Sequence, residues 1–421
     1  MYKSKPNINS SLNYWLNYIT SIQKDCFYSN FGLIYKLSIK YNLNKLDATI
    51  IVVSGTNAKG STCNILEKLL SSFGYKVGLY TSPHLIKYTE RLKINGCYLS
   101  DIKHIHALTY INYIRKNIRL TYFEFSTLSI LYLLKQYKLD FIILEVGLGG
   151  RLDATNIIDS DISIITNIDL DHTKLLGSNR ESISLEKAGI FRNFKKSIIG
   201  ETNIPKNIYK IAQYKNTILI RNKHEWLYNN TKHFWSYHDI QGSISNLPYN
   251  VNASCKSFSI AISTIRNLNI IYNINKIKKI VKDFHFPGRF NIISKNPKII
   301  LDVTHNPNGS NYLFKKLSYL SIKGKLYILI GMLKDKNIEK TIFPFISITD
   351  IWYCVSLNTI RGSKAYQIAK YLNKNTYYMF DDIKKAYNSV CKKAKKKDTI
   401  LVFGSFFLIS EIIKINNINI L

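Results

Sequence analysis

Residues 49–73 read TIIVVSGTNAKGSTCNILEKLLSSF, and this stretch decides the fold. Thr49–Val53 is a β-branched run, which predicts a buried strand. Ser54–Gly60 supplies a glycine-containing turn, and Thr62–Phe73 then carries apolar residues at helical spacing. A strand, a glycine-rich turn and a helix in this order form the opening unit of an α/β sheet.

The same alternation continues along the chain. Phe123–Tyr137 has a helical period, and the apolar run Phe141–Val146 predicts a strand. Asp161–Ile168 predicts another strand, and Glu181–Phe191 another helix. These elements indicate a mostly parallel, doubly wound sheet with its functional loops at the carboxyl ends of the strands.

The segment from Thr202 to Tyr249 differs in character, because it is polar and rich in Asn and Tyr. It shows no clear helical or alternating period, so we expect short antiparallel strands there. Two helices are then predicted at Ala253–Leu268 and Ile274–Phe284.

A fresh α/β pattern starts after Pro287-Gly288-Arg289. A helix is expected at Ser310–Leu320, and strands are expected at Lys298–Val303, Leu326–Ile330, Asp350–Val355 and Thr399–Phe403. The predicted fold class is α/β, with a P-loop-containing, mostly parallel sheet domain at residues 1–286. A smaller Rossmann-like α/β C-terminal domain is predicted at residues 287–421.

The formal net charge of +32 raises the question of nucleic acid. The basic residues are nevertheless spread along the whole chain, and the densest run, Lys392–Lys397, is typical of the solvated end of a helix. We therefore expect no nucleic-acid partner. A general positive field would instead help to attract acidic small molecules.

Composition also bears on membranes and redox compartment. The first 17 residues are polar, and no apolar run approaches the ~18 residues of a membrane span, so neither a signal peptide nor a membrane partner is expected. The six cysteines form no CxxC pair. This usage argues against a thiolate metal site or a disulfide framework and fits a reducing cytoplasm.

The turn after the first strand has the context that a phosphate-binding loop requires. Backbone N–H groups at a helix start point at phosphate oxygens, and the helix dipole favours negative charge there. The candidate nucleotide-binding residues are Thr56, Asn57, Ala58, Lys59, Gly60 and Ser61. The order differs from the common G-x-x-x-x-G-K-[ST] loop because Lys59 precedes Gly60, and an ordinary strand-to-helix turn is the alternative.

A carboxylate, Glu145, ends the apolar run at 141–146. A carboxylate at such a place is costly to desolvate unless it meets a cation. A metal ion would serve, and a capping role or an ion pair with Arg151 is the alternative.

The loop G-T-N-x-K-G-S resembles that of the Mur ligase superfamily, and further motifs resemble its dihydrofolate synthase/folylpolyglutamate synthase branch. The most specific is LEVGLGGRLDATN at residues 144–156. The others, in the family's order, are Gly74–Leu85 with Glu90–Arg91, Asp171–Thr173, Glu186–Ile190, Pro287–Phe290, Leu301–Pro307 and Phe403–Phe406. The resemblance covers nearly the whole chain.

The resemblance implies an ATP-dependent ligase that adds L-glutamate to dihydropteroate and to reduced folates through an acyl phosphate. It assigns Mg²⁺ ligation, with two ions expected, to Ser82, Glu145 and His172. The residues alone favour a hydrogen-bonded loop histidine at His172 and a solvated lysine at Lys187. The resemblance instead implies that Lys187 is carbamylated by CO₂ and helps to organise the second ion.

Other roles also come from the resemblance. Arg289, Asp302 and Asn252 match nucleotide contacts, although a linker arginine and capping residues are the alternatives. His305, a candidate catalytic residue, and Asn306 would face a cleft between the domains. The dihydropteroate-binding segments correspond to Thr121, Tyr122, Phe123 and Glu124 and to Leu152, Asp153 and Ala154, where the aromatic residues would by default be core.

One departure from the family pattern concerns the phosphate loop, where Ala58 replaces a common glycine. If this position needs a positive φ, alanine costs on the order of 1 kcal/mol there.

Two other functions compete with the main hypothesis. One is a cell-wall Mur ligase, which would carry an extra N-terminal domain, and the position of Gly55 is expected to leave no room for it. The other is a basic nucleic-acid-binding protein. A monomer is expected.

Overall fold

The computed structural model describes residues 5–23, 31–320 and 322–418. Cys26 and the first four residues of the predicted polar N-terminus lie outside them. The chain divides into two compact units, of which the larger holds Met1–Asn250 and Ser254–Asp283 and the smaller holds Val251–Ala253 and Phe284–Leu421. The sequence did not indicate the short excursion at Val251–Ala253.

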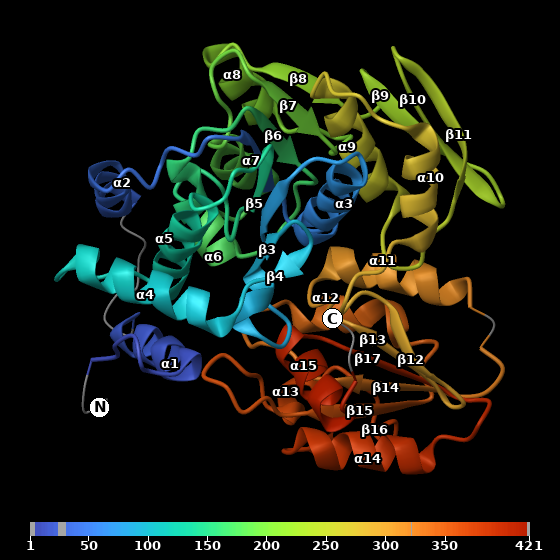
Figure 1. Cartoon of the computed structure of the whole chain (residues 1–421). Coiled ribbons are helices and arrows are strands. Elements are labelled where there is room, and N and C mark those ends of the chain that lie inside the picture. Colours follow the sequence, from blue (N-terminus) through green and yellow to red (C-terminus); the bar gives the residue numbers. More distant parts are fainter. Residues whose placement is uncertain (1–4, 24–30, 321, 419–421) are drawn as a thin grey trace. The chain divides into compact units, whose positions relative to one another are not determined.

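The larger unit is built on an eight-stranded sheet in the order β4-β3-β2-β5-β1-β6-β7-β8 (Figure 1). All neighbours from β2 to β8 are parallel, and β3 and β4 add an antiparallel edge. The strands are β1 (Thr49–Ser54), β2 (Val77–Tyr80), β3 (Leu92–Ile94), β4 (Cys97–Tyr98), β5 (Phe141–Glu145), β6 (Ile162–Ile165), β7 (Lys196–Ile199) and β8 (Ile218–Arg221).

Helices cover this sheet in two groups. Helix α3 packs against α9 and α10, while α1, α4 and α5 pack against one another (Figure 1). The helices are α1 (Leu12–Gln23), α2 (Phe31–Lys40), α3 (Lys59–Ser72), α4 (Asp101–Arg115), α5 (Tyr122–Leu134), α6 (Thr173–Leu176), α7 (Arg180–Ala188), α8 (Lys206–Tyr214), α9 (Cys255–Asn267) and α10 (Ile274–Asp283). The central strands β1 and β5 are almost wholly buried, as strands of a doubly wound sheet should be.

The polar segment at 202–249 confirms one prediction and corrects another. Its second half forms the expected antiparallel strands β9 (Trp226–Asn230), β10 (Phe234–Asp239) and β11 (Gly242–Pro248). Its first half is instead α8 and β8. The prediction missed β8 because its apolar run is only Ile218–Ile220, in an otherwise polar segment.

The smaller unit has a six-stranded sheet in the order β12-β13-β17-β14-β15-β16. Only the edge pair β12–β13 is antiparallel. Its strands are β12 (Asn291–Lys295), β13 (Lys298–Asp302), β14 (Leu326–Ile330), β15 (Ile351–Val355), β16 (Tyr377–Phe380) and β17 (Thr399–Phe403), and its helices are α11 (Pro307–Ser318), α12 (Ile338–Ile342), α13 (Ala365–Ala369), α14 (Ile383–Lys393) and α15 (Phe406–Ile415). The fold class predicted from the sequence is confirmed.

Two surface predictions can also be checked. The basic run 392–397 begins in the last turn of α14, and its lysines are exposed, as expected for a solvated helix end. Among the described residues, no helix is both long enough and apolar enough to cross a bilayer.

A buried histidine leads to a pH-dependence prediction for the larger unit. His104 on α4 has no solvent exposure and packs edge-on against Tyr88, and burial lowers its pKa to about 4. Below pH 6.5, the ordinary pKa of histidine, His104 becomes protonated in the unfolded chain but stays neutral in the folded protein until the pH nears 4. Unfolding free energy should therefore fall by about 3 kcal/mol as pH drops from 6.5 to 4.

The measurement is urea unfolding at a series of pH values, with His104→Phe as the reference. The carboxylates titrate equally in both proteins, so the difference between the two curves isolates the histidine. Parallel curves between pH 6.5 and 4 would contradict the prediction.

Candidate active site

The phosphate loop lies between β1 and α3, as predicted. Gly55 approaches the residue that follows the neighbouring strand β6 so closely that a Cβ on Gly55 would lie 1.8 Å from Oγ1 of Thr166. Lys59 begins α3, and its Nζ donates to the Gly55 carbonyl at 2.9 Å. The side chain of Lys59 thus folds back over the phosphate loop, at the N-terminus of α3.

Ala58 adopts the left-handed conformation, with φ 64° and ψ 9°, as the N-cap residue of α3. This is the condition under which alanine is costly, because its Cβ crowds the following carbonyl. The departure from the glycine of the family pattern therefore carries strain.

Replacing Ala58 with glycine is expected to raise the unfolding free energy by about 1 kcal/mol, because glycine removes that strain. Chemical unfolding of both proteins measures it. Ala107→Gly, in the interior of α4, is the matched control and should lose about 1 kcal/mol or more. A destabilised Ala58→Gly protein would refute the argument.

The loop after β6 fixes the phosphate loop through its backbone. Asn167 accepts from the Thr56 N–H with its carbonyl, at 3.1 Å, and from the Asn57 N–H with Oδ1, at 2.8 Å. The Asp169 N–H donates to Oγ1 of Thr56 at 3.0 Å, and the Thr166 hydroxyl donates to the Asn57 carbonyl at 2.6 Å. Because these bonds satisfy main-chain groups of Thr56 and Asn57, the loop is held in one shape.

The predicted metal ligands lie at the carboxyl edge of this sheet. Glu145 is buried at the end of β5, and its Oε2 accepts from the Ser82 N–H at 3.0 Å. His172 caps α6, and its Nε2 lies 4.0 Å from Oδ1 of Asp171. The described residues contain no cluster of three His, Cys, Asp or Glu that could hold a metal. The predicted set instead combines one carboxylate with a hydroxyl and an imidazole.

The alternative for Glu145, an ion pair with Arg151, is wrong. Arg151 pairs with Glu186 at 2.8 Å, and the Arg151 side chain is half exposed. Its guanidinium is therefore directed to the start of the last turn of α7 rather than to the end of β5.

Lys187 is buried on α7, so the expectation of a solvated lysine is wrong. Burial, and then the positive charge of Lys59, lower its pKa to about 7, against the opposing influence of Asp171 and Asp153. A large fraction of this amine is consequently neutral near neutral pH.

The first predicted acceptor segment opens α5. Thr121 and Glu124 form a reciprocal capping box, in which the Thr121 N–H donates to Oε2 of Glu124 at 2.7 Å. Phe123 stacks near Tyr80 with ring centroids 6.1 Å apart, and its ring occupies the space beside Gly147, where a Cβ would lie 2.6 Å from it. Phe123 therefore lies directly over the glycine loop. Tyr122 packs instead against the Arg91 guanidinium, 5.5 Å from its ring centroid.

The second segment follows that glycine loop. Asp153 is buried, and it accepts from the N–H groups of Leu148 and Thr155, each at 2.9 Å. Burial raises the pKa of Asp153, and the hydrogen bonds oppose this. Leu152 is 46% exposed, whereas Ala154 is buried. Leu152 is thus the residue of this segment that is most open to a ligand.

Sequence reasoning missed a charged group beside the first segment. The buried Arg91 donates from Nε to Nδ1 of His84 at 2.9 Å, and burial followed by Arg91 lowers the pKa of His84 to about 4. The motif Glu90–Arg91 was noted, but a sequence cannot show that a guanidinium is buried among Tyr88 and Tyr122.

The predicted nucleotide contacts of the smaller unit lie together. Asn252 donates from Nδ2 to the Arg289 carbonyl at 2.6 Å. Asp302, at the end of β13, accepts from the N–H groups of Phe290 at 3.0 Å and Thr304 at 2.8 Å. These bonds hold the turn that carries Arg289.

Two further residues follow the same strand. His305 contacts the Val303 carbonyl through Nδ1 at 2.9 Å, and its ring lies 6.1 Å from that of Phe406. Asn306 caps α11 by accepting from the Gly309 N–H at 2.9 Å. Asn306 is therefore the N-cap residue of α11, a role that was not predicted for it.

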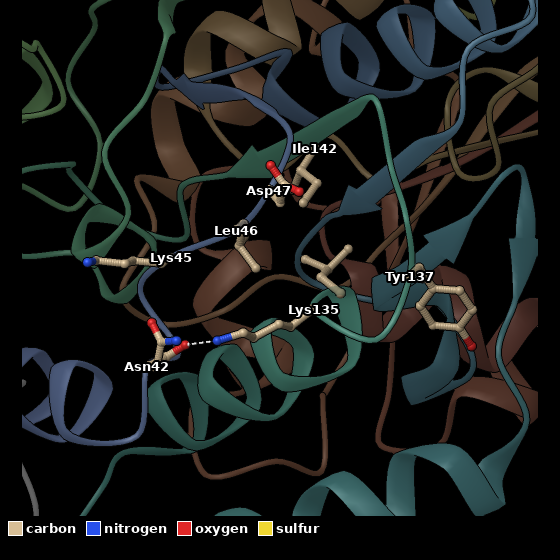
Figure 2. A pocket seen from close by; sticks show the side chains of 8 residues that line it. Asn42, Lys45, Leu46, Asp47, Lys135, Tyr137 and Ile142 are labelled. Carbon is tan, nitrogen blue, oxygen red and sulfur yellow. Dashed lines mark hydrogen bonds between the residues drawn. The ribbon is translucent and has the colours of Figure 1, made fainter.

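A separate depression of about 390 Å³ lies away from these residues. It is lined by Asn42, Lys45, Leu46, Asp47, Leu134, Lys135, Tyr137 and Ile142, and Figure 2 shows the Lys135 ammonium bonded to the Asn42 carbonyl. Because Asn42–Asp47 precede β1, it lies near the amino ends of the strands, whereas the phosphate loop lies at the carboxyl ends. It contains no predicted site residue.

Comparisons with known proteins agree with this arrangement. The Mur ligase middle domain matches residues 53–293, and the Mur ligase glutamate ligase domain matches residues 288–406. The dihydrofolate synthase/folylpolyglutamate synthase of Escherichia coli is 40% identical over 413 residues, covering 98% of this chain and 97% of the relative. That of Buchnera aphidicola from Acyrthosiphon pisum is 43% identical, covering 97% and 99%.

Solved structures give the same result. The E. coli enzyme FolC in complex with DHPP and ADP is 39% identical with a TM-score of 0.94, covering 98% of this chain and 99% of that one. The Yersinia pestis bifunctional enzyme with Mn, AMPPNP and L-glutamate bound is 37% identical with a TM-score of 0.93, covering 99% and 100%. The chain therefore belongs to the dihydrofolate synthase/folylpolyglutamate synthase family of Mur ligases.

Proposed function

We propose that this chain is an ATP-dependent, ADP-forming ligase that adds L-glutamate to dihydropteroate, giving dihydrofolate, and to reduced folates, giving folylpolyglutamates. The observation that carries the proposal is the rigid phosphate loop at the start of α3, with Lys59 folded over it. Relatives that align over nearly the whole chain carry both activities in their names. Dihydropteroate, reduced folates and glutamate are its small-molecule substrates.

The loop residues bind and orient ATP in this proposal. The N–H groups at the start of α3 face the phosphates, and Lys59 screens the charge that builds up as the γ-phosphoryl group moves to the acceptor carboxylate. Arg289 adds a planar guanidinium suited to phosphate oxygens, on a turn held by Asn252 and Asp302. Glutamate nitrogen then attacks the acyl phosphate, and inorganic phosphate leaves.

Glu145, Ser82 and His172 would hold a divalent ion, for which Mg²⁺ is the proposal. A buried carboxylate beside Ser82 fits a hard cation, whose charge offsets the cost of burying the Glu145 carboxylate. When bound, such an ion neutralises phosphate charge. A second ion, organised by Lys187, is part of the same proposal.

Carbamylation of Lys187 is supported by its environment. Its neutral amine is the form that attacks CO₂: a nitrogen–carbon bond forms as one C–O π bond opens, one proton leaves the nitrogen, and the neutral amine becomes an anionic carbamate. Burial, which lowers the pKa of Lys187 to about 7, supplies that form near neutral pH. The carbamate would then provide oxygen atoms of the kind that Mg²⁺ prefers.

The acceptor is proposed to lie along Thr121, Tyr122, Phe123 and Glu124 and along Leu152, Asp153 and Ala154. Phe123 is partly open and has a flat ring over Gly147, which suits a bicyclic pterin. Thr121, Glu124 and Asp153 fix the two backbones rather than presenting free groups. His305 remains the proposed catalytic residue of the smaller unit, near the incoming glutamate.

The test uses purified protein, ATP, Mg²⁺ and labelled glutamate, with dihydropteroate and a reduced folate offered separately. Incorporation with both acceptors supports the bifunctional enzyme. Incorporation of glutamate with only one acceptor would limit the enzyme to that one activity. Incorporation with neither acceptor would overturn the proposal. A monomeric state and a reducing, cytoplasmic location stay predictions that sedimentation and fractionation would test.

A further inference from the structure

The backbone of Ile168 is held at its N–H and at its carbonyl by the two members of one ion pair. Glu201, just after β7, accepts from the Ile168 N–H with Oε2 at 3.0 Å. Arg180, at the start of α7, donates from Nε to the Ile168 carbonyl at 3.0 Å. Ile168 itself stands between Asn167, which accepts from the N–H groups of Thr56 and Asn57, and Asp169, whose N–H donates to the Thr56 hydroxyl oxygen.

The two charged side chains are themselves fixed. Nη2 of Arg180 lies 3.4 Å from Oε2 of Glu201 and donates to the Asn203 carbonyl at 2.7 Å. The second carboxylate oxygen, Oε1, accepts from the N–H groups of Thr202 at 2.9 Å and Asn203 at 3.2 Å. The Glu201 side chain is 13% exposed, so water competes only weakly for these bonds.

We infer that the Arg180–Glu201 pair is a positioning device for the nucleotide loop. The charged groups of Arg180 and Glu201 bond to the backbone of Ile168 and to the turn at 202–203. The residues on either side of Ile168, Asn167 and Asp169, bond in turn to Thr56 and Asn57. The pair therefore acts through Asn167 and Asp169, and the inference rests on the proposed use of this loop to bind ATP. A surface ion pair that makes no contacts leading to the loop contributes about 0–1 kcal/mol to stability. It should have no effect on substrate affinity.

The test compares Arg180→Gln and Glu201→Gln in the full-length protein. Arg180→Gln removes the guanidinium, and Glu201→Gln keeps the shape and one acceptor oxygen while removing the charge. Each should raise KM for ATP by about tenfold and lower kcat, because a displaced loop misplaces the reacting phosphate. KM for glutamate should stay unchanged.

Arg221 provides the matched control, because it forms a comparable half-exposed ion pair with Glu225 at the end of β8. Arg221→Gln should lower thermal stability as much as either test variant and leave KM for ATP unchanged. An equal rise in KM for ATP in this control would overturn the inference, as would unchanged KM values in Arg180→Gln and Glu201→Gln.

Two additional measurements keep the inference testable if a variant folds poorly or if the protein shows no ligase activity. Arg180→Lys keeps the charge but not the fork, so it should fold and still lose ADP affinity in calorimetry. The double variant should lose no more affinity than the worse single variant, because both side chains hold the backbone of one residue, Ile168; additive losses would refute this. ADP affinity reports on the loop even in the absence of ligase turnover, so the two failures are distinguishable.

Discussion

Replacing Lys59 with methionine is expected to lower kcat by about a thousandfold or more. The methionine keeps most of the unbranched side chain but removes the ammonium that is proposed to screen the phosphoryl group during transfer. The folded protein loses one hydrogen bond to the Gly55 carbonyl, worth about 1 kcal/mol, so thermal stability should barely change. Glutamate incorporation and thermal unfolding measure the two effects.

Lys68→Met is the control, since Lys68 lies on the same helix with an exposed side chain. It should retain normal kcat and normal KM for ATP. Retained activity in Lys59→Met, with or without a change in the control, would remove Lys59 from the proposed machinery. A similar loss in both variants would indicate a general requirement for positive charge on α3 instead.

Replacing Lys187 with alanine is expected to lower kcat at least about a hundredfold. The substitution removes the proposed carbamate and leaves a buried space beside the phosphate loop. A small carboxylate such as acetate can enter that space and supply the missing oxygen atoms, so acetate should restore part of the activity. Mass spectrometry of the wild-type protein should find the mass of one CO₂ on Lys187 in buffer containing bicarbonate.

Two controls separate the carbamate from a simple cation. Lys187→Arg retains positive charge but cannot be carbamylated, and it should stay inactive with or without acetate. Lys256→Ala removes another lysine whose pKa is lowered by burial, and acetate should not affect it. Full activity of Lys187→Arg would show that the position needs a cation and would refute the carbamate.

The fold could be predicted from the sequence wherever a run of apolar residues corresponds to a buried element. The stretch at 49–73 predicted β1, the turn and α3, since a strand buried on both faces must be apolar throughout. Strand ends were less visible. The strand expected at 161–168 ends at Ile165, and the following residues turn their polar groups to the phosphate loop. Local propensity does not record such a tertiary contact.

The site could be predicted by position but not by environment. Glu145 and Ala58 lie where their motifs implied, and Ala58 has the positive φ that was named as a condition. Lys187 shows the limit of default rules, although a signal existed: it stands four residues after the buried Ile183, on the same face of α7. The role of Arg180 and Glu201 could not be predicted, because they lie 21 positions apart in sequence and only the fold brings both to the backbone of Ile168.

The brief excursion of Val251–Ala253 into the smaller unit has a consequence for dissecting the protein. A fragment that begins at residue 284 would carry both sheet edges of that unit, yet it would lack the amide of Asn252 that holds the Arg289 carbonyl. Neither unit is a continuous piece of chain, so cutting at a single site cannot release both intact. A split-protein version of this enzyme would need to break elsewhere. If the two units were encoded as separate genes, the smaller one would lose the bond that holds Arg289 for its proposed nucleotide contact.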